Sequence, residues 1–345
     1  MKIAVISDTH FGVHNDSPLF LDYSFRFFDS IFFPYLKDNK IDTIIHMGDL
    51  LDRRKYVNFN TLFQVKRRFF EPIRNRGIKV HCIPGNHDTY WKNTNHLNSL
   101  RELFNNDIHL YENPTTVDFD GCSILFLPWI NKGNSEECEK ALESSVSPVL
   151  IGHLELDGYE VMRGINHNGG MGDNILHKFD IVMSGHFHCK QNRANVWYLG
   201  TQYDLTFSDV NERKGFHVFD TDTKILTFVE NPYKMYHKIY YDDTISNYNQ
   251  LNTEKFKDCY LRIVVTKKTD EIAFTTLCEN LVSTGVANLS IVEEMAVEGT
   301  ESQQIDLSKG TIELINDAVD EMEMSINKEK LKTTIRELYV ESLNL

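Results

Sequence analysis

The segment that decides the fold is Ile181-Val182-Met183-Ser184-Gly185-His186-Phe187-His188. An apolar run of the kind that forms a buried strand ends here, and a Gly-His-x-His sequence follows at once. Alternate residues of an extended chain project to the same side, so His186 and His188 can face one ligand together. Four other segments repeat this design, with His, Asp or Asn directly after an apolar run: Asp8-Thr9-His10, Gly48-Asp49, Gly85-Asn86-His87-Asp88 and Gly152-His153.

These five strand ends predict a metal centre in an α/β fold. Up to about residue 232, short runs rich in Ile, Val and Leu alternate with helical stretches at about 20–38, 58–76 and 93–105. This pattern favours packed sheets flanked by helices, and ligands collect at the carboxyl ends of strands in such folds. One segment alone could be an ordinary polar turn, but five in order are hard to obtain by accident. A mixed set of His, carboxylate and amide ligands favours Mn, Fe or Zn over Mg.

The five segments resemble, in the same order, the motifs of the calcineurin-like metallophosphoesterases. The resemblance implies a β-sandwich flanked by helices and two divalent ions bridged by Asp49. It implies these further ligands: Asp8, His10 and His188 for one ion, and Asn86, His153 and His186 for the other. Two such ions about 3.5–4 Å apart can activate water and stabilise both ends of an in-line phosphoryl displacement.

Two residues near these ligands are candidates for proton transfer. His87 lies beside a ligand and has no ligand role itself, so we expect it to protonate the leaving oxygen. Asp52 is expected to hold the other ring nitrogen of His87 and to raise its pKa. Asp88 is expected to be structural, with hydrogen bonds to its loop.

The motifs do not set the substrate, because phosphatases, cyclic-nucleotide phosphodiesterases, nucleotidases and DNA nucleases share them. Within the family the chain most resembles the SbcD-type nuclease subunits of recombination-repair complexes, and among these their T-even phage members. The resemblance covers nearly the whole chain and is carried by four segments: 48–55, 114–122, 128–129 and 184–188. It implies a metal-dependent DNA exo/endonuclease subunit, with manganese as the expected metal.

The same resemblance divides the chain into parts. It implies a nuclease domain over 1–232, a small α+β capping domain for DNA recognition over 237–296 and a linker over 297–310. Residues 311–345 read as two amphipathic helices, which would bind an SbcC-type, SMC-like ATPase or dock back on the body. The family is generally dimeric, and the apolar side chains of the helix at 58–76 could serve a homodimer or simply the core.

Composition excludes several classes of protein. Among 345 residues there is no run of 18 apolar ones, so we expect no membrane span. The N-terminal residues become polar too soon for a signal peptide. The six cysteines are scattered without a CxxC pair, which argues against a disulfide scaffold and favours the cytoplasm.

The net charge of −14 disfavours DNA until its distribution is considered. Residues 53–79 contain nine basic residues and one acid, whereas residues 293–323 contain ten acids and one lysine. We expect Arg53, Arg54 and His14 to contact DNA at the rim of the metal centre. A nucleotide or phosphoprotein phosphoesterase is the enzymatic alternative. A non-catalytic adaptor is disfavoured because every expected ligand position holds a competent residue.

Overall fold

The computed structural model describes residues 1–293, 328 and 331–332, and Met1–Glu293 make up one compact unit. The proposed linker at 297–310 and the proposed helices at 311–345 lie outside the described residues, apart from these three positions. In the described part of the chain, no helix combines the length and apolarity needed to cross a bilayer. All six cysteines are free, as the sequence predicted.

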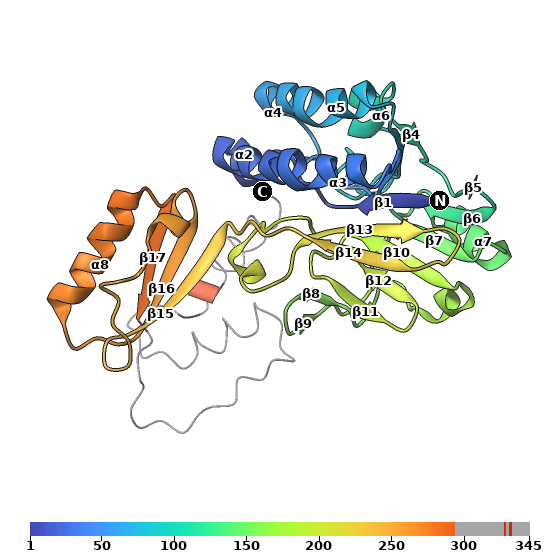
Figure 1. Ribbon diagram of the computed structural model, residues 1–345. Helices are drawn as coiled ribbons and strands as arrows, with labels where there is room; N and C mark the ends of the chain where they lie inside the picture. The colour runs from blue at the N-terminus through green and yellow to red at the C-terminus, as the bar shows by residue number, and fades with distance from the viewer. Residues whose placement is uncertain (294–327, 329–330, 333–345) are drawn as a thin grey trace. The chain divides into compact units, whose positions relative to one another are not determined.

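Two six-stranded sheets pack face to face (Figure 1). The first has the order β14-β13-β1-β2-β3-β4, and β1 to β4 are parallel neighbours. The second has the order β11-β12-β10-β7-β6-β5, and its central strands β12, β10, β7 and β6 are parallel. The strands of the first sheet are β1 (Lys2–Ile6), β2 (Thr43–His46), β3 (Lys79–Cys82), β4 (His109–Leu110), β13 (Gly215–Asp220) and β14 (Leu226–Glu230). Those of the second are β5 (Thr115–Phe119), β6 (Cys122–Leu127), β7 (Val149–His153), β10 (Ile181–Gly185), β11 (Gln191–Arg193) and β12 (Val196–Tyr198).

Alternation along the strands sorts the apolar residues into layers. On β1, Ile3 and Val5 pack between the sheets, while Ala4 and Ile6 face the helices. Helices cover the outer face of the first sheet, and their phenylalanines, with Phe28 at the centre, form a cluster of mutually tilted rings. These elements are α1 (Val13–Asp16), α2 (Pro18–Phe27), η1 (Phe28–Phe32), α3 (Phe33–Asp38), α4 (Phe59–Val65), η2 (Lys66–Phe70), α5 (Glu71–Asn75) and α6 (Ser99–Phe104). This confirms the predicted sandwich flanked by helices.

The outer face of the second sheet is covered by fewer elements. The helix α7 (Ser135–Ser144) and the 3-10 turn η3 (Asn174–Lys178) pack there around Cys138, Leu142 and Leu176. A short hairpin, β8 (Glu160–Met162) and β9 (Ile165–Asn166), lies in the long connection before β10.

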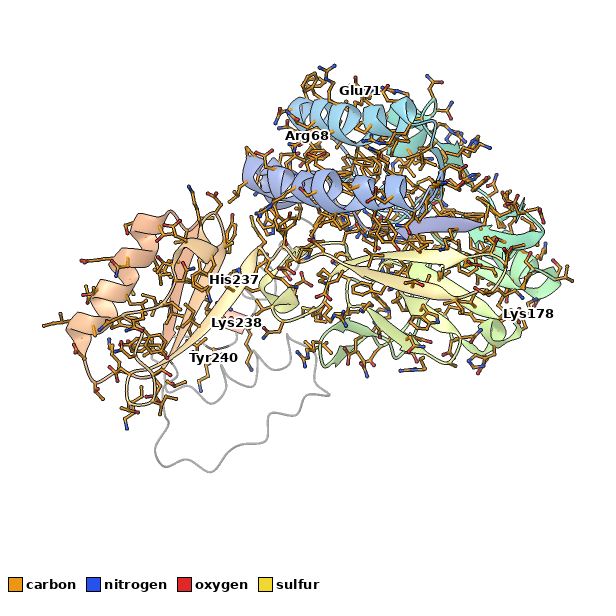
Figure 2. All side chains as sticks on the ribbon, viewed as in Figure 1. Arg68, Glu71, Lys178, His237, Lys238 and Tyr240 are labelled. Carbon is orange, nitrogen blue, oxygen red and sulfur yellow. The ribbon has the colours of Figure 1, made fainter. Side chains whose placement is uncertain are left out.

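Residues 236–293 form a separate small sheet with its own core. The parallel strands β15 (Tyr236–Asp242), β16 (Tyr260–Lys267) and β17 (Asn288–Glu293) are joined by η5 (Glu254–Phe256) and α8 (Glu271–Thr284). From the pattern of this region the sequence predicts strands over 259–267 and 288–295 and a helix over 273–283, so it misses β15. Figure 2 shows Lys238 and Tyr240 on that missed strand, and Tyr240 is 61% exposed.

Candidate metal centre

The carboxyl ends of both sheets supply the side chains of one buried centre. Asp8 follows β1 and Asp49 follows β2 in the first sheet, whereas His153 ends β7 and His186 follows β10 in the second. Asp8, Asp49 and His153 are at most 2% exposed. The structure therefore brings together segments that lie up to 180 residues apart in the sequence, as their shared design predicted.

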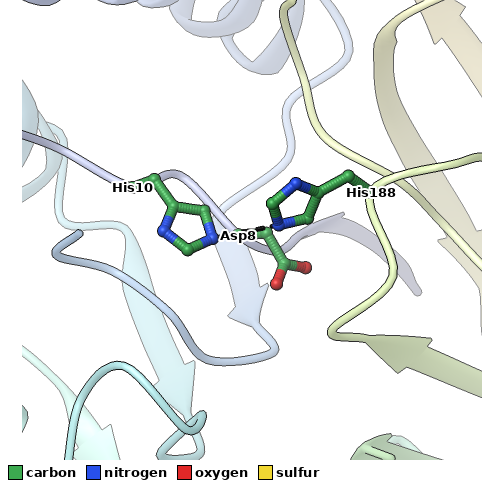
Figure 3. A group of neighbouring side chains, drawn as sticks. All are labelled: Asp8, His10 and His188. Atoms are coloured by element: carbon green, nitrogen blue, oxygen red, sulfur yellow. Dashed lines mark hydrogen bonds between the residues drawn. The ribbon is translucent and has the colours of Figure 1, made fainter. Parts of the chain in front are cut away.

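One group of potential ligands consists of Asp8, His10 and His188, whose ligand atoms lie within 4.8 Å of one another. Figure 3 shows the two imidazoles edge to edge above the carboxylate, with His10 Nε2 3.1 Å from His188 Nε2. Two imidazole nitrogens and a carboxylate that converge at this distance are a donor set that suits a divalent transition-metal ion.

A second group consists of Asp49, His153 and His186. The Asn86 amide oxygen belongs with it, because it lies 2.9 Å from both His153 Nε2 and His186 Nδ1. His153 Nδ1 donates to the Met47 carbonyl at 2.8 Å, which leaves Nε2 as the atom that faces the centre. An outer hydrogen bond of this kind is the usual way in which a ligating histidine is oriented.

Asp49 lies between the two groups. Its Oδ2 is 3.8 Å from His10 Nε2 and 3.4 Å from His153 Nε2, and its Oδ1 accepts a hydrogen bond from the His87 backbone amide at 2.7 Å. This position fits the bridging role that the family resemblance implies for Asp49.

The pKa values of the histidines in the centre are strongly shifted by burial and by neighbouring charges. Burial lowers the pKa of His10, but the hydrogen bond with Asp52 and the charge of Asp49 outweigh it and raise that pKa to about 9. Burial also lowers the pKa of His153, but the charges of Asp49 and Asp8 outweigh it and raise that pKa to about 9. Burial lowers the pKa of His186 to about 3, and the charge of His153 acts in the same direction. The carboxylates thus favour positive charge on two of the imidazoles, as expected for a site that binds divalent cations.

Several residues of the centre adopt backbone conformations that L-residues rarely adopt. Asp8, His10, Asp49 and His186 have φ values of 53°, 42°, 55° and 88°. Close approach also requires a glycine: a Cβ on Gly85 would lie 2.2 Å from Asp49 Oδ1. Local strain of this kind is typical of functional sites and persists only where the surroundings enforce it.

Asp88 holds part of this strained backbone in place. Its carboxylate, fully buried, accepts hydrogen bonds from the backbone amides of Asp49 (2.7 Å), Leu50 (3.1 Å) and Gly85 (2.8 Å). Burial and the charge of Asp49 raise its pKa to about 7. The predicted structural role of Asp88 is confirmed.

The structure corrects the predicted link between Asp52 and His87. His87 Nδ1 lies 2.5 Å from the backbone carbonyl of Asp52, whereas the Asp52 carboxylate lies 3.3 Å from His10 Nδ1. The prediction paired His87 with the correct residue, Asp52, but with its carboxylate instead of its backbone carbonyl. The sequence does not show which backbone carbonyl will accept a hydrogen bond. His87 itself packs edge-on against His10, with ring centroids 4.8 Å apart.

The three side chains that we expect to contact DNA differ in whether they already have hydrogen-bond or ion-pair partners within the protein. Arg53 donates to the Asn15 side chain at 2.6 Å and pairs with Asp16 at 3.4 Å. Arg54 has a buried Nη1 without a hydrogen-bond partner among the described residues, and burial lowers its pKa while Asp49 and Asp88 oppose that shift. His14 Nε2 lies 2.7 Å from the Leu205 carbonyl and 3.0 Å from the Tyr236 hydroxyl, so this nitrogen already has partners within the protein.

Two residues near the centre were not predicted to take part in it. The Trp129 ring lies 5.1 Å from the His186 ring and 6.0 Å from the His153 ring. Its place directly after β6, at another strand end, was the available signal. Lys214, only 1% exposed, donates to the His188 carbonyl at 3.0 Å and pairs with Asp209 at 2.7 Å, and no motif marks it.

This architecture and the clustered ligand side chains are those of a metal-dependent phosphoesterase, and the calcineurin-like phosphoesterase family profile matches residues 1–190. The chain belongs to this family, which confirms the expectation of a phosphoester-hydrolysing enzyme that uses divalent metal ions.

The similar proteins are nuclease subunits. The chain is 31% identical over 352 aligned residues to exonuclease subunit 1 of Enterobacteria phage T4, covering 99% of both chains. It is 24% identical over 268 residues to the SbcD subunit of the SbcCD nuclease of Staphylococcus epidermidis, covering 66% of this chain and 69% of that protein. Among solved structures, an archaeal phosphodiesterase aligns with a TM-score of 0.32 at 14% identity, over 67% of this chain and all of the other.

Proposed function

We propose that the protein is the nuclease subunit of a DNA recombination and repair complex and hydrolyses DNA phosphodiesters. The observation that carries the proposal is the convergence of Asp8, Asp49 and His153 with their neighbouring imidazoles into one buried donor set. The likeness to a phage exonuclease subunit over almost the entire chain supports DNA as the substrate.

The proposed ligands follow the family resemblance, and the clustered side chains support them. Asp8, His10 and His188 would hold one ion, Asn86, His153 and His186 would hold the other, and Asp49 would contribute to both. When bound, the two ions supply a Lewis acid that activates water and stabilises charge on the phosphoryl group. We assign manganese as the metal: a set that mixes imidazole, carboxylate and amide donors favours Mn, Fe or Zn over magnesium, and the family resemblance implies manganese among these.

His87 is the proposed general acid. Its Nδ1 donates to the Asp52 carbonyl, and because a carbonyl only accepts, Nδ1 keeps its proton. Nε2 is then the atom that gains and loses a proton, so it delivers one to the departing oxygen. Removing such a group typically costs 10²–10⁴-fold in rate. The Asp52 carboxylate positions His10 instead of His87.

Arg54 is the proposed contact to the DNA backbone. The buried Nη1 of Arg54 has no hydrogen-bond partner among the described residues, whereas Arg53 is already held by Asn15 and Asp16. Arg54→Gln should therefore weaken DNA binding and reduce its salt dependence by about one counterion. Arg53→Gln is the matched control and should have the smaller effect; equal effects would contradict this assignment.

Three of the other basic residues between 53 and 79, namely Arg67, Arg68 and Arg74, form ion pairs. Arg68 lies between the two rows of helices in Figure 2 and pairs with Asp22 at 2.8 Å and Asp29 at 2.9 Å. Arg67 pairs with Glu71 at 3.5 Å. We therefore assign the DNA contact to Arg54 and leave Arg67 and Arg68 out of it.

We propose homodimerisation through α4. Phe59 is 87% and Phe63 57% exposed on this helix, and Tyr56, just before it, is 66% exposed. Exposed aromatic side chains in one patch are typical of a protein interface. Phe63→Glu should convert a dimer into a monomer in light scattering while metal content stays unchanged; a monomeric wild-type protein would refute the assignment.

We also propose that residues 311–345 bind an SMC-like ATPase, as the subunit character of both relatives suggests. Deleting them should abolish co-purification with the ATPase and preserve manganese-dependent DNA cleavage. Retained co-purification would contradict this part of the proposal.

The decisive experiment compares substrates. The protein with Mn²⁺ should cleave linear and hairpin-ended DNA, and Asp49→Asn should cleave neither. A small aryl phosphodiester and a phosphopeptide serve as the rival substrates. Turnover of either rival without any cleavage of DNA would replace the nuclease with a nucleotide or phosphoprotein phosphoesterase.

A further inference from the structure

A cavity of about 590 Å³ lies directly beside the metal centre. It shares the wall formed by His153 and Trp129, and the helix α7, the loop around Gly172 and the turn η3 enclose the remainder. This volume is within the range of small-molecule binding sites, which is roughly 300–1,000 Å³. Nothing in the proposed hydrolytic machinery uses the cavity.

The chemistry of its walls selects the kind of ligand. Most of the lining is apolar: Trp129, Ile130, Leu142, Leu154, Met171 and Ile175. The charged side chains in the lining, apart from the imidazole of His153, are the carboxylates of Glu139 and Glu155, and neither Lys nor Arg is among the lining residues. A phosphate would be repelled here, whereas a neutral ring that carries amino groups would be accepted.

Trp129 places an aromatic ring at the boundary between the cavity and the centre. The ring packs against the imidazoles of His153 and His186. A ligand group that contacts Trp129 would therefore belong to a molecule whose other end lies at the metal centre.

A nucleobase meets all of these conditions. It is planar and uncharged, stacks on aromatic rings and, in three of the four DNA bases, carries an exocyclic amine for a carboxylate. We propose that this cavity receives the base of the nucleotide whose phosphate lies at the metal centre. The inference rests on the proposed nuclease function and extends it.

The proposal has a consequence for the substrate. A base can enter a side cavity only after leaving the helical stack, and that costs least in a single-stranded or frayed end. The enzyme should therefore favour ends whose terminal nucleotides are unpaired.

Gly172 offers a way to fill the cavity without strain. A Cβ at this position would meet nothing within 4 Å, and Gly172 is not among the glycines with a positive φ. Gly172→Phe therefore adds bulk at the lining without distorting the backbone, and Gly172→Ala is the matched control. Ile175→Phe enlarges a second lining residue on a different element.

The test compares a single strand that carries a normal base with one that is abasic at the nucleotide beside the cleaved bond. Wild-type protein and Gly172→Ala should cleave the normal strand with a kcat/KM about 10-fold above that of the abasic strand, as expected for one stacked base. Gly172→Phe and Ile175→Phe should lose this preference while their kcat/KM on the abasic strand stays unchanged. Equilibrium binding of both strands in chelator, where no cleavage occurs, should show the same loss of preference.

The outcomes separate the two proposals. Equal cleavage and binding of both strands by wild-type protein, or a preference that survives in both filled variants, would refute the base cavity and leave the nuclease intact. If the wild-type protein cleaves neither strand, the nuclease proposal itself fails. An unchanged rate on the abasic strand shows that the filled variants are folded and retain their metals.

Discussion

Replacing Asp52 with alanine separates two roles that one residue combines. The carboxylate Oδ1 lies 3.3 Å from His10 Nδ1, whereas the backbone carbonyl lies 2.5 Å from His87 Nδ1. Truncation of the side chain removes the first contact and retains the second. We therefore expect Asp52→Ala to weaken metal binding and to leave proton transfer by His87 close to its wild-type efficiency.

The magnitude follows from the environment of His10. Loss of a hydrogen-bonding partner behind a metal ligand typically costs about 10–100-fold in metal affinity. Asp52 also helps to raise the pKa of His10 to about 9, against the effect of burial. At about pH 7 a metal must therefore displace a proton, at a cost of about 100-fold in apparent affinity. Asp52→Ala relieves part of this competition, so its loss of affinity should be largest above about pH 9 and smaller at neutral pH.

The assay measures Mn²⁺ affinity by calorimetry at these two pH values and kcat at saturating Mn²⁺. His87→Ala should show the reverse pattern, with intact metal affinity and a kcat about 10²–10⁴-fold lower. Asp29→Ala, which removes a carboxylate that is 47% exposed and pairs with Arg68, controls for the change in net charge. The reasoning is refuted if Asp52→Ala lowers kcat at saturating Mn²⁺ as His87→Ala does and leaves metal affinity unchanged.

Three further outcomes follow from the centre. Because the pKa values of His10 and His153 are raised to about 9, both are protonated in the metal-free protein at neutral pH. Mn²⁺ binding should release protons and tighten as the pH rises to about 9, and calorimetry in buffers of different ionisation enthalpy would contradict this if the heats agreed. Asp88→Ala removes three hydrogen bonds to a carboxylate and should lower the free energy of unfolding by about 4 kcal/mol. Denaturant titration measures this loss, and a value below about 1 kcal/mol would contradict the structural role of Asp88. Gly85→Ala should abolish metal binding, measured by elemental analysis, because its Cβ would lie 2.2 Å from Asp49 Oδ1; a variant that retained its metals would show that the loop can move aside.

The sequence predicted the strand ends well because their pattern has a direct physical cause. A strand buried on both faces must be apolar, so a polar residue directly after it marks the edge of the sheet. Asp8, Asp49, Asn86, His153 and His186 all obey this rule, and the structure places them in contact.

The parts that were missed lack such a pattern. The strand β15 (Tyr236–Asp242) contains Tyr, His, Lys and Asp and is buried mainly at Tyr236 and Tyr241, so it carries no clear apolar run. The helix expected at 93–105 begins only at Ser99, where Asn98 caps it by accepting from the Arg101 backbone amide. The segment before that cap is held by side-chain hydrogen bonds of Asn95 and Asn98, which compete with helical ones.

The charge pattern was only a partial guide to DNA binding. A cluster of basic residues in the sequence does not show which of them are free, because acids from other elements can pair with them. Arg53, Arg67 and Arg68 all have carboxylate partners, and only the fold reveals that Arg54 keeps a buried nitrogen without one among the described residues.

The strained backbone explains why the five strand ends are informative only as a set. A left-handed conformation costs about 1–2 kcal/mol for a residue other than glycine, and Asp8, His10, Asp49 and His186 all adopt it. Their sum approaches the total stability of a typical domain, so each must be held by something else. Hydrogen bonds from the other strand ends hold these residues in place. Asp8 N donates to Gly48 O at 3.0 Å, and His10 N donates to Asp49 O at 3.1 Å. His186 N donates to the Asp8 carboxylate at 3.1 Å. No single strand end could maintain its conformation alone, and a sequence that retains all of them therefore retains the centre that they build.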